Sequence, residues 1–214
     1  MRVGSLILSY GVTDYLRPCI KQYKWVDKIQ VMNYLFPQSE ARPDDTPDIC
    51  KEMGVECESG TNSNQEHVLN VGLDKFEGFD AVFIADSDEF IMQDDQQKLL
   101  KLFKNCSFEK LQIHVIDYAK DLYHKHTDRT YDPIVIARPS LRFYEVRCAM
   151  GYGNCIDDIK LHHFGFLLSD EKIAWKAKKQ RITNKGIFDH LCGRAIIPTI
   201  PPDELVELLD GCIK

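Results

Sequence analysis

The stretch Ala81-Val82-Phe83-Ile84-Ala85-Asp86-Ser87-Asp88-Glu89-Phe90 decides the fold expected of this 214-residue chain. Its first five residues are apolar and include β-branched and aromatic side chains, which favours a strand covered on both faces of a sheet. Three strand–helix units precede it, and the first of them opens with the apolar run at residues 3–10. Repeated strand–helix order predicts a parallel α/β sheet. We therefore expect one α/β domain with a mostly parallel central sheet flanked by helices.

The second half of the sequence is less regular than the first. Its apolar patterns predict an amphipathic helix at residues 94–103 and strands at residues 110–118, 133–137 and 159–168. The polar residues 124–132 are interpreted as a loop, residues 170–184 as a basic helix, and residues 203–209 as a short amphipathic helix.

Composition narrows the classes of protein to consider. The chain has 27 basic and 33 acidic residues, a net charge of −6, so it lacks the basic surface expected of a nucleic-acid partner. No apolar run approaches the roughly 20 residues that a membrane helix needs, and the first strand is too short for the core of a signal peptide. The eight cysteines include no C-x-x-C pair, which argues against structural zinc and against a disulfide framework. We expect reduced cysteines in a cytoplasmic protein.

Two acids directly follow the buried strand, and two histidines lie on a later one. Ligands of parallel α/β sheets bind at the carboxyl ends of strands, where Asp86 and Asp88 stand two residues apart. Neighbouring carboxylates repel one another unless a cation lies between them, so the pair indicates a divalent metal; a solvated turn is the alternative. Of the adjacent His162 and His163, at most one can join a metal, because they point to opposite faces of a strand. Imidazole suits manganese or zinc better than magnesium or calcium.

A basic segment begins at Lys172. Six bases and no acid lie between residues 172 and 188, and Lys172, Lys176 and Lys179 share one stripe of the expected helix. Such a stripe is either solvated or able to hold phosphates opposite a metal.

Taken in order, four segments resemble the GT-A glycosyltransferases, nearest to glycosyltransferase family 2 and its small D-x-D-E-F bacterial and viral relatives. The segments are ILSYGVTDYL (7–16), QEHVLNVGL (65–73), FIADSDEF (83–90) and HFGF (163–166), the last followed by Glu171, Lys172 and Lys176. The resemblance spans about residues 3–180. It implies a GT-A domain over residues 1–197, with a nucleotide-sugar half (1–105) and an acceptor and metal-completing half (106–197). Residues 198–214 would form a tail with a short helix.

The resemblance also implies roles for matched residues. Asp86 would contact the ribose or the metal, Asp88 would coordinate Mn²⁺ or Mg²⁺, and His163 would complete the metal shell. The nucleotide-sugar site would comprise Ser9, Tyr10, Gly11, Asn70, Asp86, Ser87, Lys172 and Lys176. The family's usual D-D-G-S after the second strand is missing, because Asn33-Tyr34-Leu35-Phe36 stands there.

The implied activity is metal-dependent, inverting transfer of a single sugar from a nucleotide-diphosphate sugar, a UDP-sugar first, to an unidentified glycan, lipid-linked or protein acceptor. An oligomer or a partner subunit would fit so small a domain. Inversion needs a carboxylate base at the acceptor hydroxyl, and Asp158, Asp157 and Glu145 are candidates among which the sequence does not choose. Two alternatives stay open: a sugar nucleotidyltransferase, although the chain lacks a glycine-rich loop after its first strand, and a non-catalytic nucleotide-sugar-binding protein.

Overall fold

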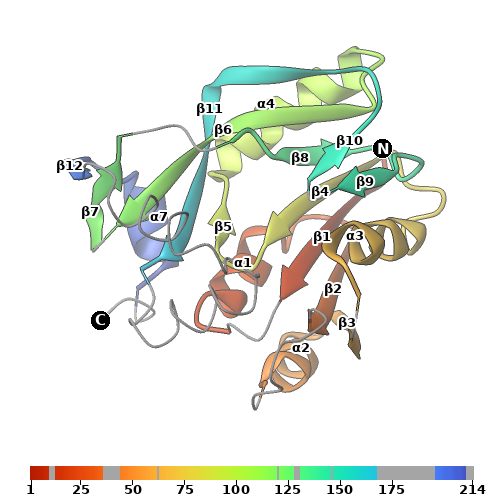
Figure 1. Ribbon diagram of the computed structural model, residues 1–214, viewed down its shortest axis with the longest axis horizontal. Coiled ribbons are helices and arrows are strands. Elements are labelled where there is room, and N and C mark those ends of the chain that lie inside the picture. Colours follow the sequence, from red (N-terminus) through yellow and green to blue (C-terminus); the bar gives the residue numbers. More distant parts are fainter. Residues whose placement is uncertain are drawn as a thin grey trace.

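The computed structural model describes residues 1–9, 13–35, 44–61, 63–119, 121–127, 131–145, 147–167 and 196–210, and these form a mixed α/β fold (Figure 1). Its first half alternates strand and helix as the sequence predicts. The elements are β1 (Val3–Ser9), α1 (Leu16–Gln22), β2 (Lys28–Leu35), α2 (Thr46–Met53), β3 (Glu56–Thr61), α3 (Gln65–Asp74), β4 (Ala81–Asp86), β5 (Glu89–Phe90) and α4 (Gln93–Asn105).

The second half is mostly β-structure. Its elements are β6 (Lys110–Ala119), β7 (Asp121–His126), β8 (Ile134–Ala137), β9 (Phe143–Glu145), β10 (Cys148–Ala149), β11 (Gly153–Phe166), β12 (Ile196–Pro198) and α7 (Asp203–Leu208). The predicted loop at residues 124–132 is wrong in part, because residues up to His126 belong to β7, which pairs with β6 and β12. Strand β11 begins six residues before its predicted start, where the polar Asn154, Asp157 and Asp158 hide the strand pattern. The predicted basic helix lies outside the described residues.

The direction of the strands explains why one edge of the sheet collects polar residues. The strand order is β12-β7-β6-β8-β4-β1-β2-β3, with β11 alongside β6. Strands β1 to β4 run parallel, and β8 lies antiparallel to both β4 and β6, so β6 points the same way as β4. Strand β11 is parallel to β6. Six strands therefore end at the same edge, which confirms the mostly parallel sheet.

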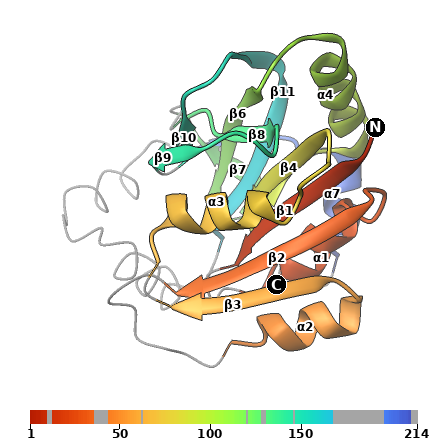
Figure 2. The same cartoon turned by 90° about the vertical axis from the view of Figure 1, so that its right-hand side faces the viewer.

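Helices cover both faces of this sheet (Figure 2). On one face, Val68, Leu69 and Leu73 of helix α3 form a core with Leu6 and Leu8 of β1. Helices α1, α2, α4 and α7 share the other, larger core. Burying these apolar side chains contributes roughly 25 cal/mol for each Å² removed from water.

One glycine sets how closely α3 lies on the sheet. A Cβ atom at Gly72 would stand 2.5 Å from Leu6 Cδ1, so a larger residue here would force the Leu6 side chain to shift. None of the helices in the described part of the chain is long and apolar enough to cross a membrane.

Candidate active site

The ends of β1, β4, β6 and β11 hold the polar residues of the candidate site. The turn after β4 is fixed on both sides by backbone hydrogen bonds: Ser87 N donates to Leu8 O at 2.9 Å, and Phe164 N donates to Asp88 O at 2.9 Å. Strand β5 continues from this turn and pairs with β11, so that His163 lies opposite Glu89. Because the turn is tied to two strands, the Asp86–Glu89 segment is held in a defined position.

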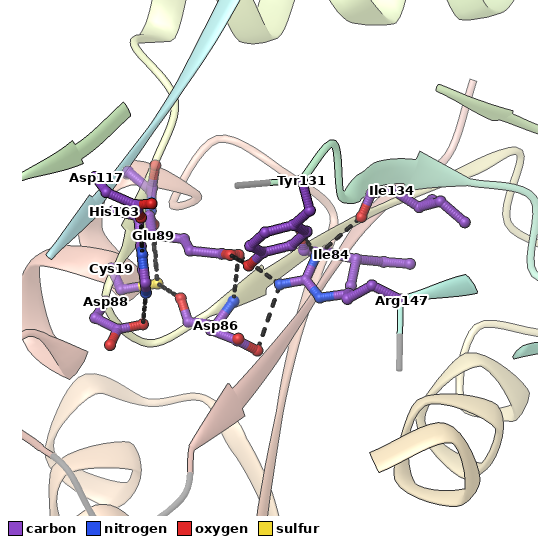
Figure 3. Close-up of polar contacts among 11 residues, drawn as sticks. Cys19, Ile84, Asp86, Asp88, Glu89, Asp117, Tyr131, Ile134, Arg147 and His163 are labelled. Atoms are coloured by element: carbon purple, nitrogen blue, oxygen red, sulfur yellow. Dashed lines mark hydrogen bonds and ion pairs between the residues drawn. The ribbon is translucent and has the colours of Figure 1, made fainter. Parts of the chain in front are cut away.

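A histidine lies between two carboxylates at this edge (Figure 3). His163 Nδ1 is 2.6 Å from Asp117 Oδ1, and His163 Nε2 is 3.7 Å from Asp88 Oδ1. Asp117 and His163 are register partners on β6 and β11, which puts their side chains on the same face. The Asp117 contact fixes the ring and turns Nε2 toward Asp88. We refer to these three residues, with Asp86, as the D-x-D cluster.

The second part of the site is an ion-pair network beside Asp86 (Figure 3). Arg147 pairs with the fully buried Glu89, and its Nη2 lies 3.3 Å from Asp86 Oδ1. Glu89 Oε2 also accepts the Asp86 backbone N–H at 2.8 Å. Burial alone disfavours the charge of Arg147, but Glu89 and Asp86 outweigh it and raise the pKa of the guanidinium. Arg147 and Glu89 thus form a buried ion pair that holds Asp86: Glu89 accepts its backbone N–H, and Arg147 pairs with its carboxylate.

The backbone of Arg147 is strained into this position. Its φ of 52° lies in the left-handed region, which costs a residue with a side chain on the order of 1–3 kcal/mol. The guanidinium offsets that cost with its carboxylate pairs and with hydrogen bonds to the carbonyls of Ile134, at 2.9 Å, and Ile84, at 3.3 Å. Its Nη1 thereby joins the start of β8 to β4.

The donor atoms of the D-x-D cluster suit a divalent cation. Carboxylate oxygens and one imidazole are ligands that Mn²⁺ accepts, and Mg²⁺ accepts the oxygens. Ligands at roughly 2.0–2.2 Å from one cation lie about 3–3.5 Å apart, close to the 3.7 Å between His163 Nε2 and Asp88 Oδ1. Asp117 stands where metal-binding histidines commonly have a carboxylate partner. Asp88 and His163 are therefore spaced to fit the predicted metal, whereas the Asp86 carboxylate faces Arg147 and does not converge with them to ligand spacing.

The structure brings together some of the predicted nucleotide-sugar residues. Ser9 ends β1 at the same edge, where its Oγ lies 2.9 Å from Thr46 Oγ1 at the start of α2. Ser87 is buried in the turn after β4. The predicted positions Tyr10, Gly11, Lys172 and Lys176 lie outside the described residues.

Asn70 has another partner. Its Nδ2 donates to Phe143 O at 2.9 Å, and its Oδ1 accepts the Phe143 N–H at 2.8 Å. Both ends of the amide are therefore used to hold β9 against α3. This is a packing role, in contrast to the nucleotide contact expected from the sequence.

The three candidate bases lie in different surroundings. Asp157 Oδ1 is 2.5 Å from His114 Nε2. His114 precedes Asp117 by three residues on β6, so strand alternation puts it on the opposite face from the D-x-D cluster. Asp157 is thus directed to the wrong face for the predicted role. Glu145 and Asp158 are exposed, and their role stays a prediction.

His162 and His163 do point to opposite faces, as the sequence predicts. His162 Nδ1 lies 2.9 Å from the hydroxyl oxygen of Tyr118, and the two rings stack. Burial lowers the pKa of His162 to about 4, so its imidazole is neutral near pH 7. His162 is a core residue.

Sequence reasoning missed Asp117, Glu89 as a buried charge, and Arg147. Asp117 carried a signal that could have been used, since a lone acid near the end of an apolar strand needs a polar partner. Arg147 carried none, because its segment lies between short, weakly patterned strands.

The sequence matches no protein-family model, and no curated protein matches it. Among solved structures, the fold is similar to S. aureus TarS 1–349 (TM-score 0.51, 13% identity, 77% of this chain and 61% of that chain). A second TarS structure gives a TM-score of 0.51 at 13% identity over 77% of this chain and 37% of that one. Glucosyl-3-phosphoglycerate synthase from Mycobacterium tuberculosis, with Mn²⁺ and UDP, gives a TM-score of 0.40 at 16% identity over 53% and 44% of the two chains, which is too slight to carry an argument.

The chain spans less than two thirds of the length of each of these structures. The likeness to TarS concerns the fold alone, and TarS is a GT-A glycosyltransferase. The chain therefore has the fold of the GT-A glycosyltransferases, as the sequence motifs predicted.

Proposed function

We propose that this chain is a metal-dependent, inverting glycosyltransferase that moves a single sugar from a UDP-sugar to an acceptor hydroxyl. One observation carries the proposal. His163 is held by Asp117 so that its Nε2 faces Asp88 across 3.7 Å, at the edge where six strands end. Ligands of α/β sheets bind at this edge, and this spacing is close to that of two ligands of one cation.

Each residue of the site has a role in this reaction. Asp88 and His163 would hold Mn²⁺ or Mg²⁺, and Asp117 is a positioning residue that fixes the His163 ring. A divalent cation, when bound, stabilises the negative charge that develops on the departing diphosphate. Arg147 and Glu89 hold the Asp86 backbone and carboxylate in place.

Inversion requires a carboxylate that takes the proton of the acceptor hydroxyl. Of the sequence candidates, Glu145 and Asp158 are exposed and able to meet an acceptor from solvent. We keep these two as candidate bases, and we drop Asp157 because it contacts His114 on the other face of β6.

The first donor to test is a UDP-sugar. TarS, which shares this fold, has also been crystallised with UDP-GlcNAc. Metal binding and donor binding are linked in the proposal, since a cation held by Asp88 would supply the positive charge that attracts the diphosphate. A panel of UDP-sugars with and without Mn²⁺ in a thermal-shift assay therefore identifies the donor. A hundredfold excess over the Kd stabilises the folded chain by about 2.7 kcal/mol.

The decisive measurement is Mn²⁺-dependent hydrolysis of the identified UDP-sugar by wild-type chain and by Asp88→Asn. We expect the variant to lose at least about a hundredfold in rate, because a ligand of the charge-stabilising cation is removed. Asp94→Asn is the matched control, since Asp94 is exposed on α4. Equal rates for wild type and Asp88→Asn would refute the metal assignment. Tight donor binding without turnover toward water or any acceptor would instead favour the non-catalytic alternative.

A further inference from the structure

A second histidine lies between carboxylates on the opposite face of β6. His114 Nδ1 is 2.7 Å from Asp132 Oδ1, and His114 Nε2 is 2.5 Å from Asp157 Oδ1. Cys155 Sγ lies 3.9 Å from His114 Nδ1. The imidazole, the thiol and the Asp157 carboxylate offer one ligand atom each within 4.8 Å of one another. We refer to these four residues as the His114 cluster.

Three separate segments build this cluster. Cys155 on β11 pairs with Gln112, two residues before His114, so strand alternation puts Cys155 and His114 on one face. Asp157 lies where the register between β11 and β6 shifts, and such bulges redirect side chains. Gln112 Nε2 donates to the Asp132 carbonyl at 2.7 Å, which anchors that residue before β8. The pairing of β6 with β11, together with the Gln112–Asp132 hydrogen bond, therefore brings these four side chains together.

A neutral His114 ring cannot donate a hydrogen bond to both of the carboxylates that it contacts. A neutral ring has a single N–H, so it can donate to Asp132 or to Asp157 but not to both. A cation held by His114, Cys155 and Asp157 removes the conflict, because one ring nitrogen then binds the cation and the other donates its N–H to a carboxylate. A carboxylate on the second ring nitrogen is the usual support of a metal-binding histidine.

The ligand types indicate which cation. Imidazole, thiolate and carboxylate together are typical of Zn²⁺, whereas Mg²⁺ and Ca²⁺ prefer oxygen ligands. The Asp157 side chain is 86% exposed, so it can move the short distance that admits an ion. Three protein ligands leave one tetrahedral position open to water.

We propose that His114, Cys155 and Asp157 form a Zn²⁺ site supported by Asp132. The site is separate from the D-x-D cluster and does not depend on the proposed function. It differs from a structural zinc site of four cysteine or histidine ligands, which the cysteine spacing argues against.

Cobalt substitution tests this proposal directly, because Co²⁺ bound to a thiolate gives a charge-transfer absorption that a site without sulfur lacks. We expect the metal-free chain to take up one Co²⁺ with this absorption and to lose the band when Zn²⁺ is added. Cys155→Ser should abolish the band, and Asp157→Asn should weaken Co²⁺ binding at least tenfold. Cys148→Ser is the matched control, because Cys148 is exposed on β10 and is not among the three clustered ligands.

The circular dichroism spectrum of each variant checks that it is folded, and Asp157→Asn replaces a side chain that is 86% exposed. Absence of the band in the wild-type chain would overturn the proposal. So would its persistence in Cys155→Ser, because the thiolate would then come from another cysteine. Because the cobalt assay measures only metal binding at the His114 cluster, its failure would leave the proposed UDP-sugar activity unaffected, and the two proposals can fail separately.

Discussion

The two histidine clusters on β6 and β11 have the same arrangement of aspartates around the imidazole ring, but they differ in solvent exposure. In each, an aspartate lies within hydrogen-bond distance of Nδ1, at 2.6 Å for His163 and 2.7 Å for His114, and a second aspartate faces Nε2. Across Nε2 the D-x-D cluster keeps a gap of 3.7 Å, whereas the His114 cluster closes to 2.5 Å. The Asp88 side chain is 5% exposed and that of Asp157 is 86% exposed.

The surroundings of each cluster, more than its residue types, therefore set what it can bind. At the carboxyl edge, two strands and a tied turn hold the ligands apart and exclude water. On the other face, the carboxylate of Asp157 lies at a bulge in β11 and is mostly exposed, so it can change its distance to His114. We therefore expect a preorganised site for a hard cation in the first cluster, and an adaptable site for a softer one in the second.

The largest expected effect comes from removing the buried guanidinium of Arg147, which pairs with Glu89 and with Asp86 of the D-x-D cluster. Arg147→Met leaves Glu89 buried and uncompensated, which should lower the free energy of unfolding by about 3–5 kcal/mol. Denaturant unfolding measures the change. The double variant with Glu89→Gln should recover much of the loss, because the buried charge is then gone. A single variant as stable as wild type would show that the network does not support the turn.

Next in size is the loss of the carboxylate behind His163. Asp117→Asn should weaken Mn²⁺ binding by about 10–100-fold, because the ring loses its anionic partner. Electron paramagnetic resonance of free Mn²⁺ gives the Kd. Asp132→Asn is the matched control: it should leave Mn²⁺ binding unchanged and weaken Co²⁺ binding at the His114 cluster. Equal effects of both variants on both metals would mean that the clusters are not independent.

Asn70 tests whether the hydrogen bonds between α3 and β9 are separate from donor and metal binding. Asn70→Ala removes both hydrogen bonds to Phe143 and should cost about 1–3 kcal/mol of folding free energy. We expect no change in the Kd for Mn²⁺ or for the UDP-sugar, which isothermal titration calorimetry measures alongside thermal unfolding. Weaker donor binding at unchanged stability would instead return Asn70 to the nucleotide site.

The smallest effect is expected at the exposed carboxylate of the second cluster. Without metal, Asp157→Asn should change the free energy of unfolding by less than about 0.5 kcal/mol, because its side chain lies mostly in solvent. With Zn²⁺ present, the wild-type chain should become more stable and the variant should gain less. Thermal unfolding with and without Zn²⁺ compares the two. A large loss without metal would show that Asp157 is part of the fold.

The parallel half of the sheet was predictable because each strand there has a strong local pattern. Apolar runs such as Ala81–Ala85 need cover on both faces, and the glycine after α2 adopts the left-handed conformation that closes a helix, with φ of 66°. The strands β7, β9, β10 and β12 were missed because they are short or polar and owe their pairing to neighbours rather than to their own residues.

Local periodicity was enough to predict the α/β class, the position of Asp86 and Asp88 at a strand end, and the opposite directions of the His162 and His163 side chains. Only the tertiary structure decided that Asp117 supports His163, that Arg147 supports Asp86, and that His114 meets Asp132 and Asp157. Those contacts join residues 18 to 61 positions apart along the chain. Strand register and a bulge bring them together, and neither is encoded in any single short segment.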